Sequence, residues 1–234
     1  NPVRWYRDQY FYYSGNPDLV PELGYTISTN YSLDRKYIFT LTYRQSERYI
    51  SEQHAFDPYS QAIKSQKENF GRMQRIEATT AIPLSINQAW QLQCNSNFSY
   101  TSYPIAVIHG EKQLRQLAAA ISLQQDFSLP AGFKAVVSSY FTTAELRGIY
   151  RTTPASYHDA GTKKSLLQNR MTVQLSVNDI FNTSRQKGHS MTDVTDFWYN
   201  DKADTRRIGL SLSYHLGGKS LKPSKGKTEE QERL

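Results

Sequence analysis

Apolar and polar residues alternate along nine stretches of this chain, each about ten residues long. The most regular stretch runs from Trp90 to Tyr100, with an amide or hydroxyl side chain at every second position. Because successive side chains of a strand point to opposite faces, this stretch predicts a strand between lipid and a wet lumen. Ten residues of about 3.3 Å, tilted by about 40°, rise about 25 Å, so Trp90 and Tyr100 would lie at the two membrane interfaces.

Connections of two lengths join the predicted strands. The strands are expected at residues 25–33, 37–43, 72–84, 90–100, 117–123, 133–146, 157–166, 171–177 and 207–214. Short turns at 34–35, 85–88, 128–132 and 167–169 alternate with longer segments, predicted as loops, at 45–69, 104–113, 148–155 and 187–200. Membrane barrels have short periplasmic turns and long external loops, and the last strand here runs toward the short-turn side.

The sequence therefore predicts an all-β fold, an antiparallel meander that forms part of a transmembrane outer-membrane β-barrel. Residues 1–22, rich in aromatics and containing two prolines and a glycine within seven residues, are expected to be an external loop segment. Residues 23–217 would be the C-terminal barrel strands, and residues 218–234 a polar, disordered periplasmic tail. Bacterial single-chain barrels have even strand counts, so about nine strands indicate a fragment of a longer barrel.

The amino-acid composition is compatible with a membrane barrel but does not by itself identify one. Hydrophobic residues make up 38% of the 234 residues and the mean hydropathy is -0.66, which is compatible with a barrel because only alternate strand residues face lipid. The formal net charge of +7 is spread along the chain without a basic stripe interleaved with aromatics, which argues against nucleic acid as a partner. The single cysteine, Cys94, excludes an internal disulfide and falls on the apolar face.

Motifs of catalysis and metal binding are not found in the sequence. The five histidines are scattered without metal-ligand spacing, and there is no phosphate-binding glycine loop or nucleophile elbow. We therefore expect no catalytic residue, no bound metal and no cofactor.

Two segments resemble the barrels of TonB-dependent receptors. The first is Gly15-Asn16-Pro17-Asp18-Leu19-Val20-Pro21-Glu22, directly before a predicted strand. The second is the stretch from Leu175 to Thr183, in which Asp179, Phe181 and Asn182 carry the likeness one strand before the last. Strict alternation puts Asp179 on the lipid face, so we expect either a bulge or a position near the outer interface.

The last strand is similar to the assembly signal of outer-membrane proteins. The pattern polar-x-Gly-x-x-apolar-x-aromatic maps to Arg207, Gly209, Leu212 and Tyr214. The resemblance implies insertion into outer-membrane lipid by the barrel assembly machinery. One departure is that the chain continues for many polar residues after Tyr214.

The resemblance also implies a barrel of 22 strands, closed by upstream strands, holding an N-terminal plug and importing a scarce nutrient with energy delivered through TonB. Neither the plug nor the TonB-contacting segment falls within this chain.

Ligand contacts are expected, if anywhere, in the aromatic opening, on Trp5, Tyr6, Tyr10, Tyr12 and Tyr13. The alternative, which we favour, is packing at the interface or within the loop. The motif from Gly15 to Glu22 is interpreted as a structural lead into a strand.

Two other functions compete with the receptor. One is a passive porin or structural outer-membrane barrel, which lacks a plug. The other is a soluble carbohydrate-binding β-sandwich, which would bury its apolar face inside.

Overall fold

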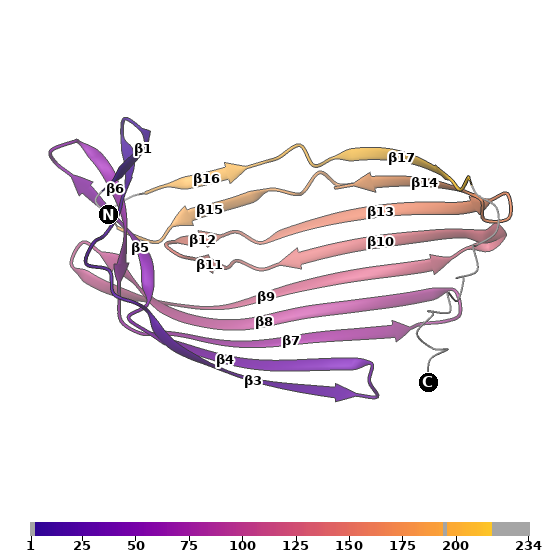
Figure 1. Cartoon of the computed structure of the whole chain (residues 1–234), viewed down its shortest axis with the longest axis horizontal. Coiled ribbons are helices and arrows are strands. Elements are labelled where there is room, and N and C mark those ends of the chain that lie inside the picture. The colour runs from indigo at the N-terminus through magenta and orange to yellow at the C-terminus, as the bar shows by residue number, and fades with distance from the viewer. Residues whose placement is uncertain (1–2, 194–195, 217–234) are drawn as a thin grey trace, which may run out of the picture.

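The computed structural model describes residues 3–193 and 196–216, so the predicted tail at 218–234 lies outside the described residues. Its main feature is one antiparallel sheet of nine strands, in the order β17-β14-β13-β10-β9-β8-β7-β4-β3 (Figure 1). We call it the wall sheet. The strands are β3 (Leu23–Leu33), β4 (Tyr37–Glu47), β7 (Met73–Ser85), β8 (Trp90–Val107), β9 (Gly110–Ser128), β10 (Phe133–Thr142), β13 (Ala155–Leu166), β14 (Met171–Asn178) and β17 (Arg207–Tyr214). The predicted all-β meander is confirmed.

The register of the wall sheet places apolar residues of neighbouring strands opposite one another, and does the same for the polar or small residues between them. Cys94 lies opposite Ile82 on one side and Leu123 on the other, whereas Asn95 lies opposite Ala81 and Ser122. Directly paired residues share a face, so apolar residues form one continuous surface and small or polar residues form the other. The apolar surface stays open to the surroundings: Ile27 is 64% exposed and Leu117 76%.

Tight turns join the strands at one end of the wall sheet, the right-hand end in Figure 1. Between β3 and β4, Asp34 and Arg35 have φ values of 51° and 54°, and the Lys36 amide donates to the Leu33 carbonyl at 3.0 Å. Two consecutive residues with positive φ define the hairpin turn whose twist matches that of its strands. This end corresponds to the predicted periplasmic side.

The opposite end is more ordered than the sequence predicted. The segments 1–22, 45–69, 148–155 and 187–200 were expected to be irregular, and each contains strands. The cap sheet has the order β1-β2-β6-β5, with β1 (Arg4–Asp8), β2 (Phe11–Ser14), β5 (Ile50–Asp57) and β6 (Ala62–Asn69). The side sheet has the order β11-β12-β15-β16, with β11 (Leu146–Arg147), β12 (Tyr150–Thr152), β15 (Gln186–Ser190) and β16 (Trp198–Asp201).

The loop expected at residues 104–113 is also wrong. Strands β8 and β9 continue through it and pair without interruption as far as Val107 and Gly110. The 18 residues of β8 extend about eight beyond the ten or so that span a bilayer.

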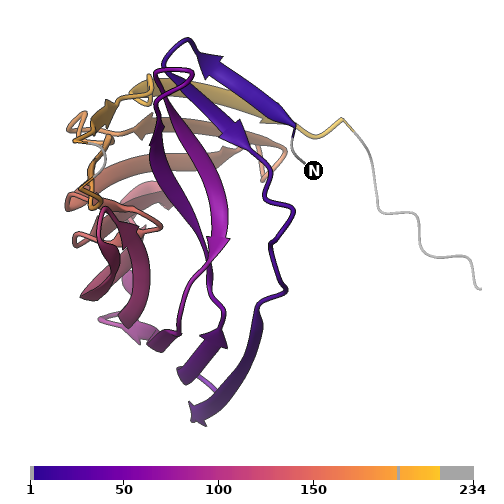
Figure 2. The ribbon, with the colours of Figure 1, turned by 90° about the vertical axis from the view of Figure 1, so that its left-hand side faces the viewer.

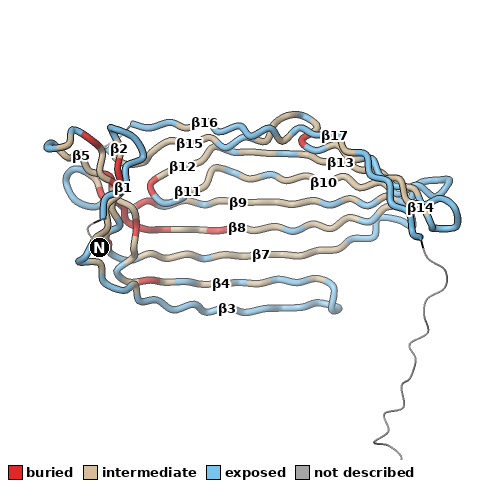
Figure 3. Tube along the Cα trace, turned by 45° about the horizontal axis from the view of Figure 1, so that its top comes forward, coloured by how far each residue is buried: buried red, intermediate tan, exposed pale blue. Residues whose placement is uncertain are grey.

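The wall sheet curves, and the cap sheet lies at the end opposite the tight turns (Figure 2). We call this the external end, because the sequence predicts that it faces outward. A hollow of about 480 Å³ on the polar side is lined by residues such as Gln91, Gln124 and Gln174, which places the polar face on the concave side. Wall strands are mostly exposed or half-buried, whereas buried residues gather at the external end (Figure 3). The buried cluster there consists of Tyr103, Ile105, Leu114 and Ile149.

The apolar face of the wall sheet has no second sheet packed on it among the described residues. A soluble sandwich requires such a cover, because the two inner faces form its core. The fold therefore favours a membrane barrel wall over the sandwich.

One short helix is described, the 3₁₀ turn at Pro130–Gly132 between β9 and β10. Among the described residues, no helix has the length and apolarity needed to cross a bilayer.

Candidate functional site

The candidate site lies at the external end, where the cap sheet, the side sheet and the extended ends of β8 and β9 meet. Strand β2 pairs in parallel with β6, so the segment before β3 and the hairpin after β4 form one unit. Together these elements stand at the end of the polar, concave face of the wall sheet (Figure 2).

The five aromatic residues proposed as ligand contacts differ in exposure, and Tyr13 is half-buried. Trp5, Tyr6 and Tyr10 are more than half exposed, and Trp5 contacts Tyr13 with 5.3 Å between ring centroids. Tyr12 is 1% exposed and lies under Tyr6, with 5.4 Å between their centroids. Tyr12 therefore packs within the cap sheet, while the exposed aromatics remain available to a ligand.

Tyr12 is fixed by a carboxylate at the end of β5. Its hydroxyl donates to Asp57 Oδ2 at 2.8 Å, and the Ser60 hydroxyl donates to the same oxygen at 2.7 Å. The amide of Tyr59 donates to Asp57 Oδ1 at 3.0 Å. These hydrogen bonds, led by that of Ser60, favour the charged form and lower the pKa of Asp57 to about 2.

A chain of ring contacts joins the cap sheet to the side sheet. Phe11 contacts His54 at a centroid distance of 5.3 Å, and His54 contacts Tyr150 at 6.4 Å. Tyr150 in turn meets Tyr199 at 5.9 Å. His54 is 4% exposed and its Nε2 lies 3.8 Å from Glu52 Oε1. Sequence inspection missed His54 and Tyr150, because neither stands in a motif.

The motif from Gly15 to Glu22 docks on the hairpin β5–β6. The side-chain Nδ2 of Asn16 donates to the Lys67 carbonyl at 2.9 Å, and its Oδ1 accepts the backbone amide of Asp18 at 2.9 Å. The Gln66 side chain donates to the Gly15 carbonyl at 2.9 Å, and Glu22 accepts the Ile50 amide at 3.1 Å. Pro17 stands in the turn at residues 17–18, and Pro21 lies in the irregular segment that leads into β3. Each of these contacts orients the chain that leads into the wall.

The second motif forms the turn that follows β14. Asp179 is 2% exposed with φ 46°, and Asn182 also has a positive φ, 56°. Asp179 accepts hydrogen bonds from the Thr183 amide at 2.8 Å and the Thr205 hydroxyl at 2.7 Å. Asp179 thus lies past the strand end, without a bulge inside β14.

The carboxylate of Asp179 holds two separate segments together. Burial alone would raise its pKa, but hydrogen bonds from Thr205, Ser184 and Thr183 hold the pKa below its usual value. Phe181 is 67% exposed and touches His158 at a ring-centroid distance of 5.2 Å. The turn after β14 is therefore tied to the start of β17 and to β13.

The residues of the predicted assembly signal all lie on β17. Leu212 and Tyr214 pair with Val173 and Met171 on the apolar face, whereas Arg207 and Gly209 face the polar side. A Cβ on Gly209 would stand 2.9 Å from the Ser176 hydroxyl oxygen, so the close pairing with β14 favours glycine. Among the described residues, β17 is paired along one edge, with β14.

A basic hollow lies where β10 and β13 separate from the side sheet. It has a volume of about 150 Å³, and Tyr140, Tyr157, Arg147, Arg185 and Lys187 are among its lining residues. Of these charges, the sequence singles out only Lys187 as a candidate phosphate contact, with a solvated charge as the favoured interpretation, and Arg147 lies far from it along the chain.

The described part of the chain has no cluster of metal-binding side chains. Within it, no group of three or more His, Cys, Asp or Glu side chains is placed to hold a metal ion. Cys94 is a free, half-buried thiol on the apolar face.

The comparisons with known proteins agree on the architecture. A family model described as an outer membrane protein beta-barrel family matches residues 1–214. A solved structure of a ferric enterobactin receptor mutant from Pseudomonas aeruginosa, in complex with enterobactin, is similar in fold with a TM-score of 0.51 and 14% identity. The match covers 86% of this chain and 32% of that chain, so this chain spans about a third of its length. No curated protein matches the sequence.

Proposed function

Because this chain belongs to the outer membrane protein beta-barrel family of the bacterial outer membrane, we propose that it is the C-terminal barrel portion of a TonB-dependent receptor. The receptor would bind a scarce nutrient outside and import it with energy supplied through TonB. Its role is binding and transport, with no catalytic step. Its other partners would be outer-membrane lipid, the barrel assembly machinery, and the plug and upstream strands of the same protein.

The observation that carries this proposal is the ordered assembly at the external end. Strands from four separate segments form the cap and side sheets there, and rings of Phe11, His54 and Tyr150 connect them. A receptor needs such a preorganised surface at the mouth of its lumen, because ordering loops on binding costs affinity. A passive porin needs an open water path instead.

The two sequence motifs give independent support. Gly15–Glu22 fixes the cap hairpin at the start of β3, and Asp179 ties the turn after β14 to the segment before β17. Both motifs resemble those of TonB-dependent receptors, and both act at the external end.

Energised transport can be separated from passive passage in cells. We expect a strain lacking the full-length gene to lose growth on one limiting nutrient, and the same loss to follow deletion of tonB or addition of a protonophore. A protein with both motifs disrupted but normal surface abundance should bind less of that nutrient. Uptake that persists without TonB and without a proton gradient would identify a passive porin and overturn the proposal.

A further inference from the structure

The basic hollow lined by Arg185 and Lys187 faces the lumen. Tyr140 of β10 pairs with Ser122 and with Tyr157, and Ser122 pairs with Asn95 of the polar face. Directly paired residues share a face, so both tyrosines that line the hollow point toward the concave interior. Lipid headgroups contact the opposite, apolar face. A charged group that reaches this hollow therefore comes through the lumen.

The charge of the hollow is unbalanced. Arg147 is paired, with its Nε and Nη2 each 3.1 Å from Glu145 Oε2. Arg185 and Lys187 also line the hollow, and neither forms an ion pair within the described residues. Two cations without a counter-charge in the same hollow are suited to an oxyanion.

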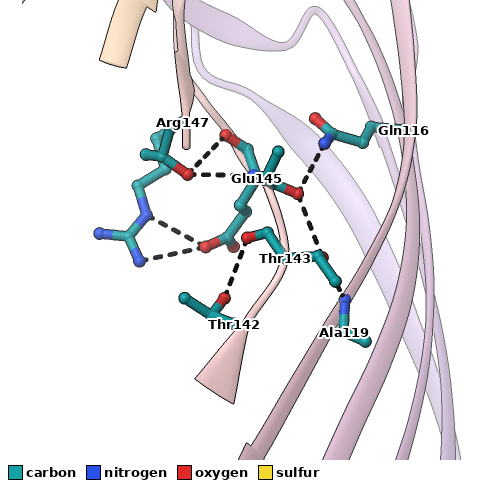
Figure 4. A network of polar contacts seen from close by, with 8 residues as sticks. Gln116, Ala119, Thr142, Thr143, Glu145 and Arg147 are labelled. Atoms are coloured by element: carbon teal, nitrogen blue, oxygen red, sulfur yellow. Dashed lines mark hydrogen bonds and ion pairs between the residues drawn. The ribbon is translucent and has the colours of Figure 1, made fainter. Parts of the chain in front are cut away.

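The rim of the hollow is held in place by a polar network (Figure 4). Gln116 donates to the Ala144 carbonyl at 2.6 Å, and Thr143 Oγ1 accepts the Ala119 amide at 2.9 Å. The Glu145 amide donates to Thr152 Oγ1 at 3.0 Å. The segment that leaves β10 is thereby anchored to β9 and β12, and Glu145 is oriented toward Arg147. A rim held by hydrogen bonds within the chain lowers the cost of ordering the site on binding.

One wall of the hollow is aromatic. The rings of Tyr140 and Tyr157 are stacked, with centroids 5.1 Å apart and planes 28° from parallel. Tyr157 is 40% exposed, so its ring presents a surface for a flat group. The hollow thus combines a positive side with a planar apolar side.

We propose that this hollow binds the oxyanion of a small ligand, such as a phosphate ester, whose organic portion lies against Tyr157. The inference rests on the proposed function, because it assigns the ligand class of the receptor's lumenal mouth. Arg185 and Lys187 bind the negative oxygens, and the Arg147–Glu145 pair keeps the neighbouring rim rigid.

Titration calorimetry of the full-length protein in detergent tests the site, with phenyl phosphate as the probe. We expect saturable binding that weakens at high ionic strength, and at least about tenfold weaker binding by the double variant R185Q/K187Q. The matched control is Arg151→Gln, since Arg151 is exposed on β12 beside Thr152 and does not line the hollow. It should bind like the wild type.

A second pair of measurements tests the aromatic wall. Tyr157→Leu should weaken phenyl phosphate binding several-fold and leave the weaker binding of methyl phosphate unchanged. Absence of saturable binding by the folded wild type would overturn the proposal. So would equal losses in R185Q/K187Q and Arg151→Gln, which would indicate diffuse attraction.

These outcomes are independent of energised transport. Calorimetry reports equilibrium binding by purified protein, whereas the TonB requirement is measured as uptake in cells. Phenyl phosphate binding together with TonB-independent uptake would support the oxyanion site and contradict the receptor proposal. TonB-dependent uptake without phenyl phosphate binding would support the receptor proposal and contradict the oxyanion site.

Discussion

The wall sheet and the external assembly are stabilised in different ways. In the wall, the apolar face is open and each strand is held by its ladder and by its neighbours, so Ile27 remains 64% exposed. At the external end, residues pack against protein, and Ile105 is fully buried beside Tyr103, Leu114 and Ile149. The wall therefore depends on lipid for its apolar contacts, whereas the external assembly has a core of its own. Substitutions of the same chemistry should have different effects in the two regions.

The largest effect is expected at the last wall strand. Tyr214→Asp or Gly209→Asp in the full-length protein should abolish membrane insertion, because one places a charge at the lipid boundary and the other drives a side chain into Ser176. Heat-modifiable migration of outer-membrane fractions measures insertion.

Deletion from Lys219 onward is the control for the last strand and should leave insertion intact. Blocked insertion after this deletion, together with normal insertion of Tyr214→Asp, would show that the assembly signal lies elsewhere.

The two faces of β8 should respond differently to a charge. Cys94→Arg places a cation on the lipid face near the bilayer midplane, and should cost about 2 to 4 kcal/mol of folding free energy in lipid. Asn95→Arg, one residue on, faces the lumen and should cost much less. Denaturant titration in liposomes measures both. A larger loss for Asn95→Arg would mean that the apolar face is not the lipid face.

Removing one methyl group should distinguish packing against protein from packing against lipid. Ile105→Val should destabilise the external assembly by about 0.5 to 1.5 kcal/mol, because nothing replaces the lost contacts. The matched change Ile27→Val, on the open face of β3, should be nearly neutral because lipid adapts. Hydrogen exchange at the Tyr103 amide for Ile105→Val, and at the Tyr43 amide opposite Ile27 for Ile27→Val, reports the difference. Equal effects at both sites would contradict the comparison.

The smallest effect concerns the acid response of the cap sheet. The pKa of Asp57 is lowered from 3.8 to about 2, so its hydrogen bonds contribute stability above about pH 4 that is lost as the pH falls toward 2. Limited proteolysis by an acid protease should show the cap hairpin opening in that range while the wall stays protected. Asp57→Asn should flatten this pH dependence, and an unchanged profile would show that Asp57 is not the titrating group.

The sequence predicted the wall well because lipid and lumen impose opposite demands on alternate residues. The strand at Trp90–Tyr100 is an example, and its pairing partners follow the same two faces. No such contrast acts at the external end. Residues 102–106 of β8 are all buried, so neither face is marked by polarity. Strand β6, Ala62–Asn69, is polar on both faces because water and protein share its surroundings.

The sequence predicted the two motifs but not the basic hollow, because only the motifs are marked by a local pattern. Gly15–Glu22 and Asp179 were found because each lies in a contiguous motif that can be read from the sequence, although both contact segments distant along the chain. Arg147, Arg185 and Lys187 come together only because the turns after β10 and β14 converge, and no local pattern encodes that convergence.

The parallel pairing of β2 with β6 has a consequence for the order of folding. Every pairing in the wall sheet joins strands that are consecutive within that sheet, so the wall can assemble one hairpin at a time. The cap instead joins residues 11–14 to residues 63–66, with the hairpin β3–β4 between them. This parallel pairing can form only after the hairpin β3–β4 has folded back and brought the two segments to the same end. The cap should therefore close last, after insertion, and its sequence can change without delaying the biogenesis of the barrel.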